Sequence, residues 1–398
     1  MTLPPSPEPF VLLDDARVGG EGARLYRDPV GEIVARRPEE VRPALEAIRA
    51  ATARGLHAAG YLRYEAGHAL EPVLEPLSTG TNDGEAPLLW FGLFSSCALL
   101  TPEEVASLLP SPDAVSHGPA SPTIGARDHG AAFATVLDYI RAGDIYQANL
   151  TLAATVPLPG DPLAAYAAIR PRAAMGHGAL IRHDGRHVLC FSPESFFAVE
   201  DGAITALPMK GTAPRHANSA ADARAVAELR SDPKQRAENL MIVDLIRNDL
   251  SRVCRAGSVR VPDLFTVESY PTVHQLTSRV IGQLSEGIDA VDALAALFPC
   301  GSVTGAPKIR AMQVVAEVER HRRGLYTGSI GSIDPEGNAR FNVAIRTISL
   351  EKGAAQGVMG IGSGIVADSD PRAEWMECLD KARFLEAPDG TDKQGMQR

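Results

Sequence analysis

Two carboxylates and an amine share one face of a predicted helix near the carboxyl end of the chain. The helix is expected at about residues 371–385, because Asp370 supplies an N-cap acceptor and a proline follows it. At about 100° per residue, Glu374 and Glu377 lie about 60° apart, and Lys381 lies between them. Such a stripe is common on solvated helices, so the neighbouring segments decide whether it takes part in chemistry.

Three glycines alternate just before this helix, in the Gly-Ile-Gly-Ser-Gly run at 360–364. Glycine is disfavoured inside strands, and here it would let a ligand approach the backbone and an anion meet amide N–H groups. Beside the carboxylates, this run suits an anion together with Mg²⁺, since hard cations take oxygen ligands and retain water. The run is not GxGxxG, so it does not indicate a dinucleotide site.

A second acidic helix is predicted over residues 234–253. Its middle is apolar on nearly every side, which indicates a buried helix, and buried charges require partners or a metal. Glu238, at the edge of the apolar stretch, is therefore a candidate for a further metal carboxylate. Asp244, Arg247 and Asp249 are expected to form an internal ion network.

A lysine follows an apolar strand in the Pro-Met-Lys-Gly-Thr run at 208–212. Desolvation would lower the pKa of Lys210 and give a nucleophilic amine, while a solvated turn lysine is the ordinary alternative. Glu194 ends another apolar run and offers a carboxyl for general acid catalysis. His274 has polar neighbours, and a structural role is as well supported there as a ligand contact.

Composition excludes several classes of protein. The chain has 398 residues, and 39 Lys and Arg against 49 Asp and Glu give a formal charge of −10, so nucleic acid is not an expected partner. No apolar run approaches the roughly 20 residues of a membrane span, and no secretory signal is visible. Five widely spaced cysteines without a CxxC pair fit reduced thiols. We therefore expect a cytoplasmic enzyme or binding protein with no membrane partner.

Hairpins grouped between helices predict an α+β fold. Asp-Gly pairs at 184–185 and 201–202 mark antiparallel hairpins. Pro/Ser-rich residues 110–126 are interpreted as a linker between residues 1–109 and 127–387, with a disordered tail at 388–398. Further helices are expected at 39–58, 129–142, 218–230 and 306–319, and further strands at 60–64, 88–94, 145–156, 326–334, 339–350 and 357–361.

Together these motifs resemble the chorismate-utilising enzymes. The family fold is a large α+β unit with two β-sheets face to face, helices outside and the active site between the sheets. The resemblance therefore predicts one interleaved unit, to which residues 1–109 contribute. The matching runs are 144–150, 192–194, 208–212, 236–240, 299–308, 323–328, 344–347 and 362–381.

The resemblance implies a role for each candidate residue. Glu238 and Glu377 would bind Mg²⁺, with Glu374 nearby through water, and the metal would hold the ring carboxylate of chorismate. Glu194 would protonate the departing C4 hydroxyl. The residues implied to hold the substrate carboxylates or line the site are Tyr326, Arg346, Gly362, Gly364, Lys381, Thr304 and His274.

Two positions distinguish the members of this family. Where isochorismate and salicylate synthases carry a lysine that activates water, this chain has Gln147. Where anthranilate synthases have alanine, it has Lys210, as do the members that aminate C4. Retention at C4 requires two displacements, which a lysine adding at C2 and leaving as ammonia adds at C4 would provide.

The resemblance thus implies Mg²⁺-dependent amination of chorismate. No nucleophile elbow is visible in the sequence, so a separate glutamine amidotransferase subunit is expected to deliver the ammonia, and the chain alone should use free ammonium. An anthranilate-forming enzyme, a non-catalytic chorismate-binding subunit and a Schiff-base lyase are the alternatives.

Overall fold

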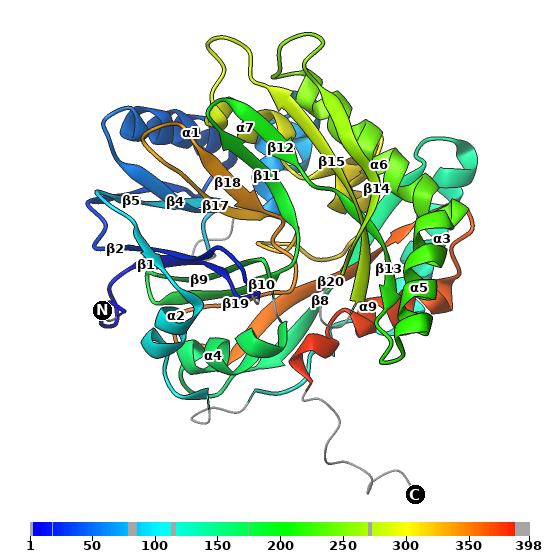
Figure 1. Cartoon of the computed structure of the whole chain (residues 1–398), viewed down its shortest axis with the longest axis horizontal. Coiled ribbons are helices and arrows are strands. Elements are labelled where there is room, and N and C mark those ends of the chain that lie inside the picture. Colours follow the sequence, from blue (N-terminus) through cyan, green and yellow to red (C-terminus); the bar gives the residue numbers. More distant parts are fainter. Residues whose placement is uncertain are drawn as a thin grey trace, which may run out of the picture.

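Two antiparallel β-sheets with helices on their outer faces make up the computed structural model of the chain (Figure 1). The structure describes residues 3–17, 19–78, 86–112, 117–173, 175–269 and 273–386. The predicted α+β class with two packed antiparallel sheets is confirmed. No helix in these ranges is both long enough and apolar enough to cross a lipid bilayer.

The first sheet contains the longest strand pair of the molecule, β8 with β20. In spatial order its strands are β16 (Gly305–Ala306), β8 (Gln147–Pro157), β20 (Gln356–Ile365), β19 (Thr347–Leu350), β10 (Arg186–Ser192), β9 (His177–His183), β1 (Phe10–Asp15), β2 (Gly22–Arg27) and β6 (Ala98–Leu100), and β7 (Ser121–Pro122) pairs with β8.

The second sheet also combines strands from both ends of the chain. In spatial order they are β13 (Met209–Pro214), β15 (Val273–Gln283), β12 (Ala203–Ala206), β11 (Ser195–Glu200), β18 (Ala339–Asn342), β17 (Ser329–Ile333), β4 (His57–Leu62), β5 (Leu89–Phe94) and β3 (Gly31–Ala35), and β14 (Arg260–Ser269) pairs with β15.

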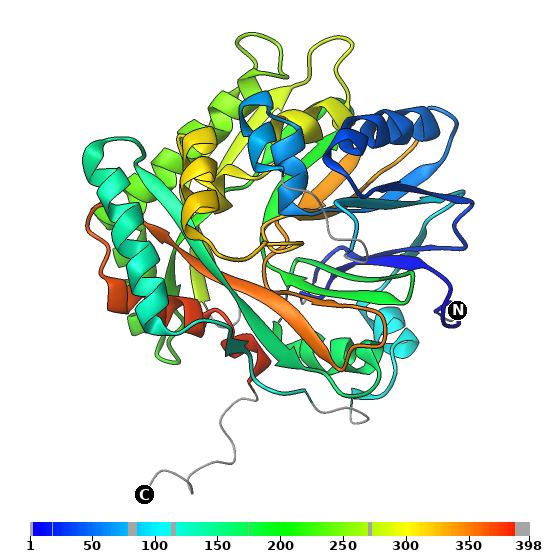
Figure 2. The ribbon, with the colours of Figure 1, turned by 180° about the vertical axis from the view of Figure 1, so that it is seen from behind.

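Helices cover the outer faces of both sheets. Helices α1, α6 and α7 share an apolar cluster with the second sheet, α4 packs on the first, and α3 and α8 lie together against β8 (Figure 2). The helices are α1 (Pro38–Thr52), α2 (Pro102–Leu108), α3 (Ala126–Ala142), α4 (Pro162–Ala173), α5 (Ser219–Ser231), α6 (Pro233–Ser251), α7 (Ala290–Leu297), α8 (Lys308–Val318) and α9 (Pro371–Asp380), with 3₁₀ turns η1 (Tyr64–Ala69), η2 (Pro72–Leu77), η4 (Gly301–Val303) and η5 (Arg383–Leu385).

Side chains from the inner faces of the two sheets form a shared core. Tyr61 and Trp90 of the second sheet meet Ile181 and Cys190 of the first, and each of the four is at most 2% exposed. Alternation along each strand sends every second side chain into this layer. The core fixes the separation of the two sheets and so the position of anything bound between them.

The two predicted hairpins are confirmed, and each turn has a left-handed backbone. Asp184 and Gly185 join β9 to β10 with φ of 47° and 73°, and Asp201 and Gly202 join β11 to β12 with φ of 50° and 75°. Aspartate followed by glycine tolerates this conformation at both central positions, which explains why the pair marks these turns in the sequence.

Two predicted elements differ from the structure at functionally important points. The expected strand at 339–350 is two strands, because the chain leaves the second sheet after β18 and joins the first at β19. The glycines at 360–364 do not end a strand; they lie inside β20, which pairs with β8 as far as Ile365. Long-range pairing therefore outweighs the low strand propensity of glycine here.

Helix α6 is less buried than its apolar sequence predicts. Leu240 is 43% exposed, while Ile242 and Val243 are buried, so only one face packs on the core. The three-residue ion network is wrong as predicted, because Asp244 pairs with Arg247 at the surface and Asp249 pairs elsewhere.

The predicted linker contains regular structure in its described part. Residues 121–122 form β7, and α3 begins at Ala126; residues 113–116 and the predicted tail at 388–398 lie outside the described ranges.

Candidate active site

A cavity of about 720 Å³ lies where the chain passes between the sheets. Glu194 stands between β10 of the first sheet and β11 of the second, and Arg346 stands between β18 and β19 with a φ of 51°. A left-handed arginine is uncommon, and such backbone is often found at functional sites. The lining includes the predicted residues Glu194, Lys210, Glu238, Tyr326, Arg346, Gly362, Gly364, Glu374, Glu377 and Lys381.

Lys210 reaches this cavity because β13 is irregular where it carries the lysine. The register with β15 shifts between Met209 and Thr212, which marks a β-bulge, and Gly211 has a φ of 94°. A bulge re-aims a side chain that regular alternation would send elsewhere, and a left-handed glycine accommodates it. The dipeptide Lys-Gly is therefore the local sequence that turns this amine toward the site.

The Lys210 amine makes no hydrogen bond or ion pair with any residue in the described ranges. Burial lowers the pKa of Lys210, and the nearby Lys381 lowers it further, whereas Glu194, Glu238 and Glu377 oppose the shift. An unpaired lysine in such surroundings loses its proton more readily than a surface lysine and is the better nucleophile.

Glu194 is 8% exposed, and its Oε1 accepts a 2.7 Å hydrogen bond from the Ser302 hydroxyl. Burial raises the pKa of Glu194, although the Ser302 hydrogen bond and the charges of Lys210 and Lys381 offset part of the shift. A carboxyl with a raised pKa can hold and deliver a proton near neutral pH. The pairing of β11 with β18 also shifts register just after Glu194, between Ser195 and Phe197.

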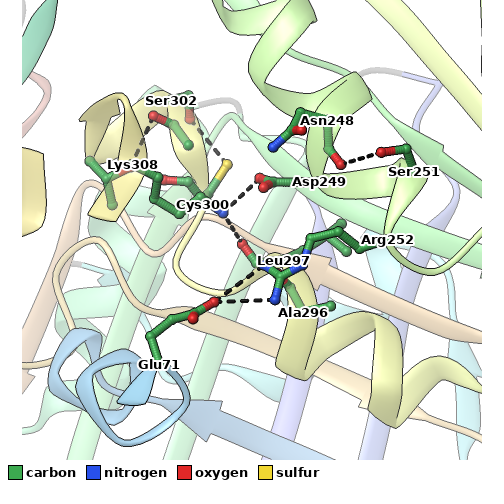
Figure 3. A network of polar contacts seen from close by, with 12 residues as sticks. Glu71, Asn248, Asp249, Ser251, Arg252, Ala296, Leu297, Cys300, Ser302 and Lys308 are labelled. Carbon is green, nitrogen blue, oxygen red and sulfur yellow. Dashed lines mark hydrogen bonds and ion pairs between the residues drawn. The ribbon is translucent and has the colours of Figure 1, made fainter. Parts of the chain in front are cut away.

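A buried ion pair fixes the loop that carries Ser302 (Figure 3). The Lys308 amine donates to Asp249 at 2.6 Å and to the Leu297 carbonyl at 2.7 Å, and Cys300 lies 3.2 Å from the Ser302 hydroxyl. The contacts of Lys308 join the start of α8 to α6 and to the end of α7, on either side of the loop that contains η4. Ser302 is a functional candidate that the sequence does not indicate, because a serine shortly before a helix is normally interpreted as an N-cap residue.

The glycines of β20 present backbone groups to the cavity. Opposite Gly362, the Thr151 amide binds Glu319 instead of β20, so this is a non-hydrogen-bonded position of the ladder. The amides of Gly362 and Gly364 therefore point away from β8, toward the side that lines the cavity. On the same side the Gly362 carbonyl accepts a 2.7 Å hydrogen bond from Lys381. An anion placed here would meet backbone N–H groups, as the sequence predicts.

Carboxylates from α6 and α9 face this cavity. Glu377 pairs with Lys381 at 2.8 Å, and Ser369 donates to Glu374 Oε1 at 2.6 Å. Burial raises the pKa of Glu238, as does the nearby charge of Glu377, while Lys210 and Lys234 oppose the shift. The two carboxylates thus repel each other across the site.

These residues fit a loosely held magnesium ion. In the described part of the chain, no three His, Cys, Asp or Glu side chains come together as a ready metal cluster. Mg²⁺ commonly uses one or two carboxylates and keeps several waters. Glu374 Oε2 is buried without a hydrogen-bond partner, and a cation near it would also relieve the repulsion between Glu238 and Glu377.

Tyr326 and Arg346 complete the wall opposite these carboxylates. Tyr326 lies directly over Gly360, where any side chain would collide with its ring. Burial lowers the pKa of Arg346, whose guanidinium contacts no hydrogen-bond acceptor among the residues described. Arg346 is therefore a cation held out of bulk solvent and available to an anionic ligand.

Three predicted residues lie outside the lining of the cavity. His274 binds Asp222 at 2.9 Å and Ser269 at 2.8 Å, and the Thr304 hydroxyl bonds back to the carbonyls of residues 300 and 301. Gln147 is closer to the site, because its amide nitrogen lies against Gly364 and its Oε1 is buried without a partner.

Comparison with known proteins was made against family models and individual sequences. A family model described as chorismate binding enzyme matches residues 8–387. Aminodeoxychorismate synthase component 1 of Klebsiella aerogenes is 44% identical over 258 residues, which cover 65% of this chain and 57% of that protein. Anthranilate synthase component 1 of Streptomyces coelicolor is 44% identical over 251 residues, covering 62% and 48%. The match thus spans about half the length of these relatives.

Solved structures give the same fold. Anthranilate synthase component I of Streptococcus pneumoniae superposes with a TM-score of 0.77 at 26% identity, covering 97% of this chain and 94% of that one. The menaquinone-specific isochorismate synthase of Escherichia coli has a TM-score of 0.71 at 19% identity, covering 95% and 87%, which supports the fold alone.

Proposed function

This chain belongs to the family of chorismate-binding enzymes, and we propose that it aminates chorismate at C4, giving 4-amino-4-deoxychorismate. The observation that carries the proposal is the unpaired Lys210 amine, turned by a β-bulge into the same cavity as the protonatable Glu194. Relatives named aminodeoxychorismate synthase component 1 support this choice.

The first step uses both residues. The neutral Lys210 amine adds to C2, the two ring double bonds shift, and the C4–O bond breaks while Glu194 gives its proton, so the hydroxyl leaves as water. The lowered pKa of Lys210 and the raised pKa of Glu194 favour the protonation states that this step needs.

The second step returns the two ring double bonds to their original positions. Ammonia adds to C4, the double bonds return, and the C2–N bond breaks to release Lys210 as a neutral amine. The new C4 ammonium gives one proton to the Glu194 carboxylate, which restores the acid. The sum is chorismate and ammonia giving the amino product and water, with two displacements that together retain the configuration at C4.

The remaining residues would hold the dianionic substrate. Arg346, Lys381 and the amides of Gly362 and Gly364 offer positive charge and N–H donors to its carboxylates. Magnesium, held by Glu238 and Glu377 with Glu374 nearby, would neutralise one carboxylate when bound. Gln147 in place of a water-activating lysine supports amination over hydration.

The ammonia would come from a second protein. Relatives of this chain are named component 1, and we extend the proposal to a glutamine amidotransferase as the second component. The reaction would take place in the cytoplasm, on the route to p-aminobenzoate and folate.

Anthranilate formation is the second candidate, because a relative named anthranilate synthase component 1 is equally identical to this chain. The two products differ chemically, since anthranilate has lost the enolpyruvyl group that 4-amino-4-deoxychorismate keeps.

Product identification tests the proposal. The purified chain is incubated with chorismate, MgCl₂ and ammonium chloride, and the products are separated by liquid chromatography with mass detection. The expected main product is 4-amino-4-deoxychorismate, formed only when ammonium is present. Anthranilate or isochorismate as the main product would overturn the proposal.

A further inference from the structure

A second cavity, of about 380 Å³, lies between η1, the end of α8 and the turn that follows it. Several polar atoms that line it are buried and have no hydrogen-bond partner among the residues that the structure describes: the Tyr64 hydroxyl, both ring nitrogens of His68, Glu65 Oε2 and the Ser78 hydroxyl. Tyr64 and His68 are only 4% and 6% exposed. Folded proteins leave few such groups unsatisfied, so these atoms favour a polar guest in the cavity.

The unsatisfied atoms call for a hydrogen-bond donor. Glu65 Oε1 accepts from the Gly324 amide at 3.0 Å, but Glu65 Oε2 is 3.9 Å from its nearest cation, Arg63, which is beyond hydrogen-bond distance. Burial lowers the pKa of His68, and the charge of Glu65 offsets only part of the shift, so the neutral ring offers one acceptor nitrogen. A carboxylate oxygen beside neutral acceptors matches an N–H-bearing cation.

The most buried cation of the cavity wall, Arg323, does not fill this role. The Arg323 guanidinium, 1% exposed, is already bonded to Glu319 at 2.7 Å and to the carbonyls of Asn149 and Val303 at 2.6 and 2.9 Å. It also lies 4.5 Å over the ring of Tyr64, and no hydrogen bond between it and the Tyr64 hydroxyl is present in the described part of the chain. The rest of the wall is partly apolar, with Leu77, Leu88 and Val315.

We propose that this cavity binds a small organic ammonium compound, with the ammonium on Glu65 and Tyr64 and a short hydrocarbon body against the apolar wall. The same head group occurs in simple amines and in amino acids. An amino acid would add a carboxylate near the exposed side chain of Arg320 at the rim.

One ion pair, Glu319 with Arg323, connects this cavity to the active site. Glu319 and Arg323 line the second cavity, and they also hold the Thr151 amide and the carbonyls of Asn149 and Val303. Asn149 and Val303 line the active-site cavity. A guest ammonium beside Tyr64 would stand close to the Arg323 guanidinium, which lies 4.5 Å over the Tyr64 ring, and so would change the support of the active-site wall. By linkage, chorismate would change the affinity for the guest by the same factor.

Calorimetry on the full chain tests the site without any turnover. The probes are n-butylammonium and L-norleucine, which share the ammonium and the hydrocarbon body, with n-butanol and n-valerate as matched compounds lacking the ammonium. We expect saturable 1:1 binding of the two ammonium probes alone. Tighter binding of norleucine would identify an amino-acid site, and tighter binding of butylammonium a simple-amine site.

Two conservative variants locate the binding. Glu65→Gln keeps an oxygen for the Gly324 amide and should weaken binding by about tenfold or more, because the charge is lost. Tyr64→Phe keeps the ring beneath Arg323 and should weaken binding by about threefold without lowering the melting temperature, because its hydroxyl has no partner to lose. Tyr139→Phe is the control, since the Tyr139 hydroxyl bonds Glu317 outside the cavity.

The coupling is measured by repeating the titration with chorismate present and ammonium absent, which should change the dissociation constant of the probe. An unchanged constant would overturn the coupling. Absence of saturable binding, equal binding of the alcohol, or binding unaffected by Glu65→Gln would overturn the site and leave a cavity filled by water. None of these results depends on which product the enzyme makes.

Discussion

Lys210 and Lys308 are two lysines withdrawn from bulk solvent, and they differ in what surrounds the amine. Lys308 donates to Asp249 and to a backbone carbonyl, whereas Lys210 has no hydrogen-bond partner among the described residues. A paired ammonium is held in its charged form, but an unpaired one is pushed toward the neutral amine. Burial alone therefore does not make a lysine reactive; the missing counter-ion does.

Removal of the Lys210 amine should have the largest effect. Lys210→Ala should slow formation of the 4-amino product on the order of 10³-fold, because the nucleophile is lost. Lys210→Arg keeps the positive charge, but its guanidinium stays protonated and cannot add to C2, so it should fail as well. Product formation is followed by chromatography, and near-normal activity of the arginine variant would show that Lys210 acts only through its charge.

Glu194→Gln should follow, with a loss of about 10²- to 10³-fold in kcat, because the C4 hydroxyl then departs without a proton. The glutamine can still accept the hydrogen bond from Ser302, so the fold should be kept. Steady-state rates and the melting temperature check this. An unchanged rate would show that another group is the general acid.

Lys308→Met should lower stability strongly and activity weakly, the opposite of what is expected for Lys210→Ala. It leaves Asp249 buried without its partner, which should cost about 3–5 kcal/mol of unfolding free energy and lower the rate far less than Lys210→Ala. Urea denaturation measures the stability. The double variant with Asp249→Leu should recover part of the loss, and a stable single variant would contradict a structural role.

Ser302→Ala should have the smallest effect and the clearest pH signature. Ser302 stabilises the Glu194 carboxylate, so its loss raises the Glu194 pKa further. In the proposed mechanism the rate requires Glu194 protonated and Lys210 neutral, so one limb of the pH profile reports the Glu194 pKa and the other reports the Lys210 pKa. The limb that reports Glu194 should therefore move to higher pH and the other limb should stay, with Ser302→Thr restoring the original profile.

The sequence predicts much of the fold because hairpins and amphipathic helices are local. Asp-Gly turns and the N-cap of α9 depend on neighbouring residues only. The split between β18 and β19 and the continuation of β20 depend on partners far along the chain, so local propensity misses them. The sequence pattern likewise does not predict the pair of β14 and β15, since much of β14 is exposed and lacks a clear apolar pattern.

The residues of the candidate site also divide into those that the sequence indicates and those that only the fold brings into place. Charged residues with an uncommon setting, such as Lys210 and Glu374, can be picked out from their sequence neighbours. Ser302 and Glu319 cannot, because their roles depend on what the fold brings to them. Sequence can indicate the groups proposed to react, while the groups that hold them in place emerge only in three dimensions.

The bulge at Lys210 also bears on how activities diversify. Because the irregular turn at Gly211 aims this side chain into the cavity, the residue at 210 contributes little to strand pairing or to the hydrophobic core. Its identity should therefore be able to change with little effect on folding. A single codon change could therefore exchange one chorismate reaction for another on an unaltered scaffold, and position 210 is where directed evolution of this enzyme should begin.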